Sequence, residues 1–207
     1  MTGVQTCALP ISRTFGQGLT VQRNRLDVDL TRLNRIGQRR DGSQFFQRCA
    51  VTTFARHLLG KSVPCPIVFV DSPGSNFWNT WQDYVKNHLL KQGLISPEDL
   101  HLYKITSSVE EAAEEVKHFY SNYHSLRYAR EDVVMRLHRK PTEEQVAYIN
   151  DNWPDIKRGG KFSVSTALPV ERDEPALKDL HRLIFNFNRK DHGRLRMLID
   201  YLNGLPE

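Results

Sequence analysis

The feature that most constrains the fold is a short apolar run at residues 67–70, Ile-Val-Phe-Val, which follows Pro64 and Pro66. It ends in Asp71-Ser72-Pro73-Gly74, a loop signal. A continuous apolar strand of this kind is typical of the centre of a parallel sheet that is covered on both faces. It is also the longest purely apolar run, far short of the roughly 18 residues that a membrane-spanning helix needs. We therefore expect an α/β protein without a transmembrane span.

The segment after this run has helical spacing. Its apolar positions are Trp78, Trp81, Val85 and Leu89, with Ser75 or Asn76 as the N-cap and Gly93 as the stop. Ser96 and Pro97 then predict a short helical turn, and residues 102–105 predict a second strand. Two strands joined by a helix of this length pair in parallel with a right-handed crossover.

A second helix follows this strand pair. Either Ser107 with Glu110 or Ser108 with Glu111 forms its capping box. The apolar stripe behind the box comprises Val109, Ala112, Ala113, Val116 and Tyr120. The chain from residue 64 to residue 123 therefore predicts the order β-α-β-α.

The remainder predicts a β-β-α-β-β-α unit. Strand-like runs at residues 126–130 and 133–138 indicate a hairpin, and Thr142 with Gln145 forms a capping box before a helix that we expect Gly159-Gly160 to end. Alternation predicts strands around residues 162–167 and 183–187, and Asp191 caps a last helix that runs towards Gly204. We expect an antiparallel sheet with its helices on one face.

The first third of the chain differs from the rest in charge. Residues 1–65 hold ten Lys and Arg against three Asp, a net charge of +7, whereas residues 66–207 hold nineteen against twenty-one acids. The excess basicity makes nucleic acid a conceivable partner, through the run at residues 35–40, but a solvated face explains that run better. Among three functional hypotheses, nucleic-acid binding is the weakest.

The opening residues 1–12 lack the basic and apolar regions of a signal peptide. They resemble translated sequencing adapter, and we leave them out of the fold. Residues 13–60 show no clear pattern, and part of this segment could come from the wrong reading frame of the gene. Within it, Leu26, Leu30 and Leu33 are spaced like one face of a helix, with Val28 off that face. Three cysteines without a CxxC spacing predict no zinc site and a reduced, cytoplasmic compartment.

The loop after the first strand is the main candidate site. Ligands of open α/β sheets bind outside the carboxyl ends of the strands, where loop amides and a helix N-terminus receive anions. The predicted substrate-binding residues are Asp71, Ser72, Pro73, Gly74, Ser75 and Trp78. A capped loop without a ligand is the alternative, and no P-loop or dinucleotide fingerprint is present.

Other candidates have simpler explanations. Trp78 and Trp81 could stack on a base, but their helical spacing also fits a core position. The acidic residues Glu110, Glu111, Glu114 and Glu115 lie opposite the apolar stripe and fit a solvated surface. Cys65 reads as a small buried residue, and the eight histidines show no metal-ligand spacing. The residues alone predict no complete catalytic set, no metal and no cofactor.

A family resemblance rests on three stretches: residues 66–74 (PIVFVDSPG) with Phe77-Trp78, residues 93–100 (GLISPEDL) and residues 105–112 (ITSSVEEA). Together they resemble the Lonely Guy (LOG) family of Rossmann-like proteins. Residues 119–128 and 194–203 look like the C-terminal extension of a longer bacterial branch. The resemblance covers residues 60–203.

The resemblance implies hydrolysis of the N-glycosidic bond of a nucleoside 5'-monophosphate, giving free base and ribose 5-phosphate, without a metal and in a homo-oligomer, usually a dimer. The family's Pro-Gly-Gly-x-Gly-Thr-x-x-Glu motif, which holds the phosphate and supplies the carboxylate, is absent from this sequence. The resemblance therefore implies a C-terminal part of such an enzyme that is inactive alone. Its parts are residues 61–123, the end of the Rossmann-like domain, and residues 124–207, an α+β extension. The alternative is a non-catalytic nucleotide-binding or assembly module.

Overall fold

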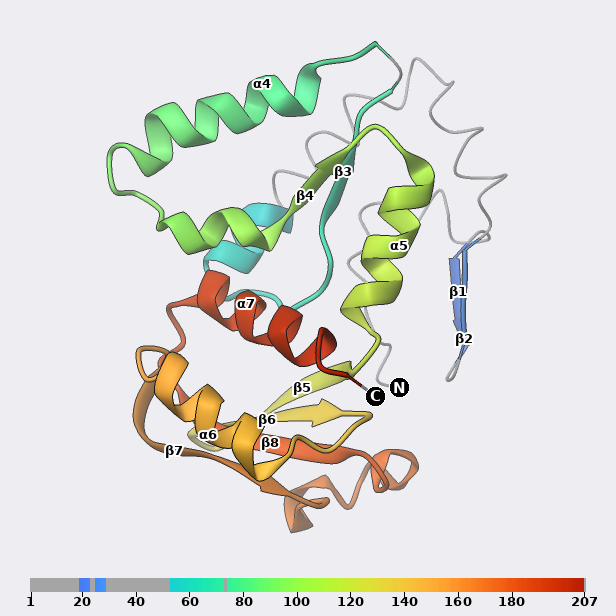
Figure 1. The fold of residues 1–207 in the computed structure, drawn as a ribbon, viewed down its shortest axis with the longest axis vertical. Helices are drawn as coiled ribbons and strands as arrows, with labels where there is room; N and C mark the ends of the chain where they lie inside the picture. Colours follow the sequence, from blue (N-terminus) through green and yellow to red (C-terminus); the bar gives the residue numbers. More distant parts are fainter. Residues whose placement is uncertain (1–18, 23–24, 29–52, 73, 207) are drawn as a thin grey trace. The chain divides into compact units, whose positions relative to one another are not determined.

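The computed structural model describes residues 19–22, 25–28, 53–72 and 74–206 (Figure 1). It is a mixed α/β protein of two compact units, residues 1–118 and 119–207, and the division falls in the last turn of a helix. The predictions for residues 1–12, for the basic run at 35–40 and for Cys7 and Cys49 lie outside the described residues. No helix in the described ranges has the length and apolar character needed to cross a membrane.

A short hairpin contains the first part of the stretch whose leucines are spaced as on a helix, and residues 29–33 of that stretch lie outside the described residues. Strand β1 (Leu19–Gln22) pairs antiparallel with β2 (Arg25–Val28), and Leu26 lies in β2 opposite Val21. Leu26 and Val28 are two residues apart, which is the period of a strand, so Leu26 starts no helix at this point.

The first unit contains the predicted parallel strand pair. Strand β3 (Val68–Val70) pairs with β4 (Lys104–Thr106), and Val70 lies opposite Thr106. Between them lies α4 (Phe77–Tyr84), which continues as a π-helical turn (Val85–Leu90). A 3₁₀ helix (Pro97–Leu102) starts in a capping box of Ser96 and Asp99, so β4 begins two residues later than predicted because Leu102 still belongs to that helix. Helix α5 (Val109–Phe119) follows.

Aromatic rings form the core of the first unit. The buried residues of this core are the aromatic Phe54, Phe69, Trp78 and Tyr103 and the aliphatic Ile67 and Leu102. Phe69 of β3 stacks on Trp78 of α4 with ring centroids 4.3 Å apart, and Trp81 meets Phe69 edge-on at 5.1 Å. These contacts hold α4 against the strand pair and thereby fix where the loop between β3 and α4 lies.

The second unit has the predicted β-β-α-β-β-α order. It comprises β5 (Tyr123–Ala129), β6 (Asp132–Leu137), α6 (Glu143–Asn152), β7 (Lys157–Ser165), β8 (His181–Phe187) and α7 (His192–Asn203). The strands form one antiparallel sheet in the order β5-β6-β8-β7. Apolar residues of α6 and α7 share one core with alternate residues of the strands, so both helices cover the same face (Figure 1). The predicted antiparallel sheet and its single helical layer are confirmed.

One local prediction for this unit was wrong. Helix α6 starts in the expected box, in which Gln145 N–H donates to Thr142 Oγ1 at 3.2 Å, but it ends at Asn152. Gly159 and Gly160 lie inside β7, where the register with β8 shifts, and Gly160 has φ +73°. The glycines therefore mark a bulge at the sheet edge and not the end of a helix.

The other face of this sheet carries a buried ionic network. Arg136 of β6 lies opposite Arg182 of β8, and their side chains are 4% and 0% exposed. Glu171, from the segment that joins β7 to β8, accepts hydrogen bonds from Arg136 Nε at 2.7 Å and from Arg182 Nε at 3.0 Å. Two positive charges side by side repel each other, and the Glu171 carboxylate between them offsets this repulsion.

This network predicts that the second unit loses stability in acid. Burial alone would raise the pKa of Glu174, which bonds to Arg136 and Arg127, but these hydrogen bonds outweigh it and lower the pKa. A lowered folded-state pKa contributes stability above the unfolded value of about 4.3, and that stability is lost as the pH falls through the folded value. In urea unfolding between pH 3 and 7, we expect Glu174→Gln to reduce the pH dependence below about pH 4.5. Glu144→Gln, on the exposed face of α6, is the control, and an equal reduction in both variants would contradict the assignment.

Candidate functional site

The candidate site lies at the carboxyl ends of β3 and β4. Because the two strands are parallel and Val70 lies opposite Thr106, the loops that follow them leave the same edge of the sheet. Asp71 N–H donates to Thr106 O at 2.9 Å and extends the pairing by one residue. Each loop then leads into a helix, α4 or α5.

Asp71 organises the first loop through its carboxylate, which is buried in the unit. Its Oδ1 accepts a hydrogen bond from Ser75 Oγ at 2.8 Å, and its Oδ2 accepts one from Trp78 N–H at 3.3 Å. Phe77 N–H donates to Ser75 Oγ at 3.3 Å. The loop turns where Ser75 N–H donates to Ser72 O at 2.9 Å, and Gly74 takes the φ of +79° that favours glycine.

These bonds bear on the predicted anion site. The first-turn amides of α4 that a phosphate would use, those of Phe77 and Trp78, donate to Ser75 and to Asp71 instead. The Asp71 carboxylate thus caps the helix from within the chain and places a negative charge at its positive end. This geometry favours a capped loop over an anion site at the start of α4. An anion that bound there would have to displace the Asp71 carboxylate.

The six predicted residues lie in different surroundings. Ser72, Gly74 and Ser75 are exposed, whereas Asp71 and Trp78 are buried. Pro73 lies outside the described residues. Trp78 is 7% exposed with its ring stacked on Phe69, which matches the core interpretation of the tryptophans. As a substrate-binding set, the six residues stay a prediction.

A second carboxylate at this edge was not predicted. Thr106, the last residue of β4, donates its hydroxyl to Glu111 Oε2, and Ser108 N–H donates to Thr106 Oγ1 at 3.0 Å. Glu111 N–H in turn donates to Ser108 Oγ at 3.2 Å, which is half of the expected capping box. The sequence placed Glu111 among the solvated acids of α5, and only its spacing from Ser108 hinted at a position near the strand end. Glu111 is an exposed residue whose carboxylate is anchored by the strand.

The two carboxylates at this edge differ in access, because Asp71 is buried with both oxygens bonded whereas Glu111 is exposed. Two carboxylates, Asp71 and Glu111, follow the two strands, and ionised carboxylates accept hydrogen bonds without donating any. Acidic groups at the strand ends of dinucleotide-binding sheets bind ribose hydroxyls in this way. Of the two, the exposed Glu111 carboxylate is the one that could accept a hydrogen bond from the hydroxyl of a solute.

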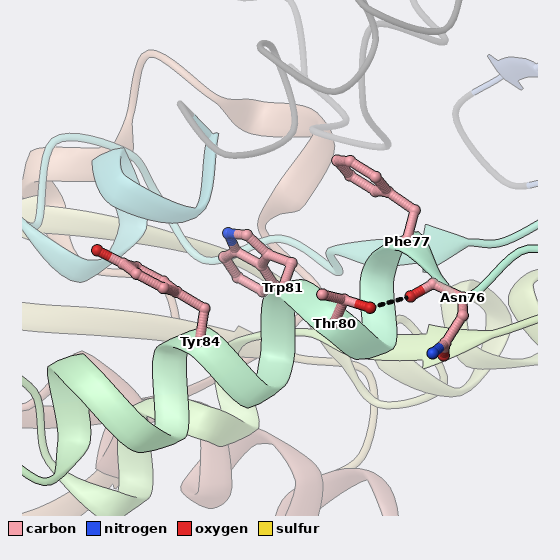
Figure 2. A pocket seen from close by; sticks show the side chains of 5 residues that line it. All are labelled: Asn76, Phe77, Thr80, Trp81 and Tyr84. Carbon is pink, nitrogen blue, oxygen red and sulfur yellow. Dashed lines mark hydrogen bonds between the residues drawn. The ribbon is translucent and has the colours of Figure 1, made fainter.

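The outer side of α4 carries an aromatic hollow of about 430 Å³. Figure 2 shows its lining, which comprises Asn76, Phe77, Thr80, Trp81 and Tyr84. Phe77 and Tyr84 are 43% and 56% exposed, and Trp81 connects the hollow to the core through its edge-on contact with Phe54 at 5.4 Å. The hollow offers ring faces and almost no polar groups.

Removing the Asp71 carboxylate tests its capping role. In Asp71→Ala the Ser75 hydroxyl and the Trp78 N–H lose their acceptor, and we expect about 1–2 kcal/mol less free energy of unfolding for the first unit. Urea unfolding followed by tryptophan fluorescence measures this loss. Asp83→Ala, on the exposed face of α4, is the matched control, and equal stability of both variants would contradict the capping role.

Within the part of the chain that the structure describes, no three His, Cys, Asp or Glu side chains group as metal ligands do. Cys65 is buried, as its sequence context predicted, with Sγ 3.2 Å from His57 Nε2. The chain matches no protein-family model, no curated protein and no solved structure.

Proposed function

We propose that this chain is a C-terminal part of a LOG-like nucleoside 5'-monophosphate phosphoribohydrolase, with a Rossmann-like first unit, that binds nucleotide without cleaving it alone. The observation that carries the proposal is the exposed Glu111 carboxylate, which Thr106 anchors at the carboxyl end of β4, beside the loop that follows the parallel strand β3. Such an edge is where α/β sheets bind ligands, and carboxylates accept the hydroxyls of ribose. The resemblance of residues 60–203 to the family supports the same substrate class.

The absence of hydrolysis follows from what the edge lacks. Cleavage of an N-glycosidic bond develops oxocarbenium character on the ribose, which a free carboxylate stabilises while it orients water. Asp71 is engaged in capping α4, and the glycine-rich motif that would hold the phosphate is absent from the sequence. We expect the chain to act in the cytoplasm, as the cysteine usage indicates, and to need no cofactor.

The test compares two neighbouring carboxylates on α5. Glu111→Gln removes the charge that Thr106 anchors, whereas Glu110→Gln removes an exposed charge one residue away that accepts from Ser108 Oγ at 3.0 Å. We expect AMP and ribose 5-phosphate to bind about tenfold more weakly to Glu111→Gln, since hydrogen bonds to charged groups contribute about 1.5–3 kcal/mol. Isothermal titration measures the affinities. Equal weakening in both variants, or none in Glu111→Gln, would overturn the ribose assignment.

The aromatic hollow on α4 favours a second candidate, an assembly module. Exposed Phe77 and Tyr84 beside half-buried Trp81 form an apolar surface of the kind that protein contacts use. A homo-oligomer that forms through this face would dissociate when Phe77→Ser and Tyr84→Ser are combined. Light scattering across a concentration series measures the mass, and an unchanged mass in the double variant would rule out this face.

A further inference from the structure

The second unit contains a cluster of cationic and donor groups on the sheet face opposite the helices. Ser125 and Arg127 lie two residues apart on β5, and Arg136 lies opposite Ser125 on β6. The three side chains therefore share one face. His124 adds a fourth group, because its Nδ1 lies 2.9 Å from Ser125 Oγ beside the irregularity in the β5–β6 register.

One carboxylate closes this cluster. Glu174 Oε2 accepts hydrogen bonds from Arg127 Nη1 at 2.8 Å and from Arg136 Nη2, so two guanidinium groups converge on one oxygen. Arg136 Nη1 also lies 3.5 Å from Ser125 Oγ. Asp173 accepts a hydrogen bond from Arg127 Nη1 at 3.1 Å and is largely exposed.

The inner and outer halves of the ionic network differ in access to water. The inner half, Glu171 with Arg182, is 1% and 0% exposed, and Arg182 also donates to the carbonyl of Leu177 at 2.8 Å. In the outer half, Glu174 is 26% and Arg127 28% exposed. The Glu171–Arg182 pair is therefore closed to water, whereas the Glu174 carboxylate is accessible to water and to a solute.

We propose that Ser125, Arg127 and Arg136 form a binding site for the phosphoryl group of a phosphate monoester, and that the Glu174 carboxylate occupies this site in the free chain. Arginine guanidinium groups that converge on one oxygen match the geometry of phosphate recognition. A phosphoryl group carries about −1.5 to −2 charges and three acceptor oxygens, against one charge from Glu174, so it uses the Ser125 hydroxyl as well as both arginines. The site lies in the second unit and does not rest on the proposed function.

The charge around His124 agrees with this site. Burial lowers the pKa of His124, and the positive charges of His138, Arg136 and Arg182 lower it further, while Glu174 raises it. Arg136 belongs to β6 and Arg182 to β8, His138 directly follows β6, and Glu174 lies in the segment between β7 and β8. A bound phosphoryl group brings more negative charge than Glu174 and therefore raises the pKa of His124 above its value in the free chain.

The first experiment removes the internal competitor. Glu174→Gln keeps the shape of the side chain and removes its charge, and we expect inorganic phosphate to bind the full chain at least tenfold more tightly than it binds the wild type. Adding Arg127→Gln to this variant removes the gain, and Glu144→Gln on α6 is the matched control without effect. No gain in Glu174→Gln, or a gain that survives Arg127→Gln, overturns the proposal.

The second experiment uses the wild-type chain and does not depend on the folding of a variant. Ring-proton NMR follows the titration of His124 in phosphate and in chloride at equal ionic strength, with a His124→Gln sample to assign the signal. The site predicts a higher pKa of His124 in phosphate than in chloride. Identical titration curves in the two salts overturn it.

Discussion

Replacing Glu171 by glutamine is expected to lower the free energy of unfolding of the second unit by about 3–5 kcal/mol, the cost of breaking a buried ion pair from one side. Glu171 is 3% exposed and holds Arg136 and Arg182 together, and its Oε2 also accepts from Leu168 N–H at 3.0 Å. The neutral amide leaves the buried Arg182 guanidinium without a carboxylate partner and leaves Arg136 with Glu174 alone. Urea unfolding followed by amide signals of the β-sheet measures the loss.

The control for this prediction is Glu131→Gln, an exposed residue in the turn between β5 and β6. A surface change of this kind stays within about 0.5 kcal/mol. If Glu171→Gln were no less stable than Glu131→Gln, the backbone carbonyls of residues 177–180 would be enough for Arg182, and Glu174 would be enough for Arg136. In that case the Glu171 carboxylate would not be needed to hold the segment between β7 and β8 against the sheet.

The second large effect is expected at Asn203, the last residue of α7. Its Oδ1 accepts from the backbone N–H groups of Asn122 and Tyr123 at 3.1 and 2.8 Å, and its Nδ2 donates to Phe119 O at 2.8 Å. One buried side-chain amide thus bonds to three backbone groups between the end of α5 and the start of β5. Asn203→Leu leaves all three without a partner at about 1–3 kcal/mol each, so we expect a loss of about 3 kcal/mol or more.

Asn152→Leu provides the matched comparison for Asn203. Asn152 is exposed at the end of α6, and its side chain donates only to Tyr148 O, at 2.9 Å. Thermal and urea unfolding of the two variants separates the loss of a buried hydrogen-bond hub from the substitution itself. Similar losses in both would show that Asn203 does not connect α7 to the sheet as its contacts indicate.

The order of the elements was predictable where the sequence carries local signals. Capping residues at Ser96 and Thr142 place helix starts correctly, because a cap acts within three residues of itself. The role of Gly159-Gly160 was not predictable in the same way, since a glycine pair suits a helix end and an edge bulge equally. The burial of a charged Arg136 in β6 was not predictable, because the Glu171 that neutralises it lies 35 residues away in the sequence.

The candidate site was predictable in position but not in its bonding. The order of strand, loop and helix indicated the edge where Asp71 and Thr106 lie. The direction of the Asp71 carboxylate, back into the first turn of α4, depends on how the loop closes, and no residue pattern encodes it. The anchoring of Glu111 by Thr106 likewise depends on the strand register, which the sequence does not give.

The most direct test of the proposed function is a titration of the full chain with CMP, followed by amide NMR and by chromatography of the released base. Our account predicts that the largest shift changes fall on residues 72, 74, 75, 106 and 111, and that no cytosine accumulates above a protein-free control. Released cytosine would contradict the inactivity of the chain. Shift changes that avoid the carboxyl ends of β3 and β4 would contradict the site.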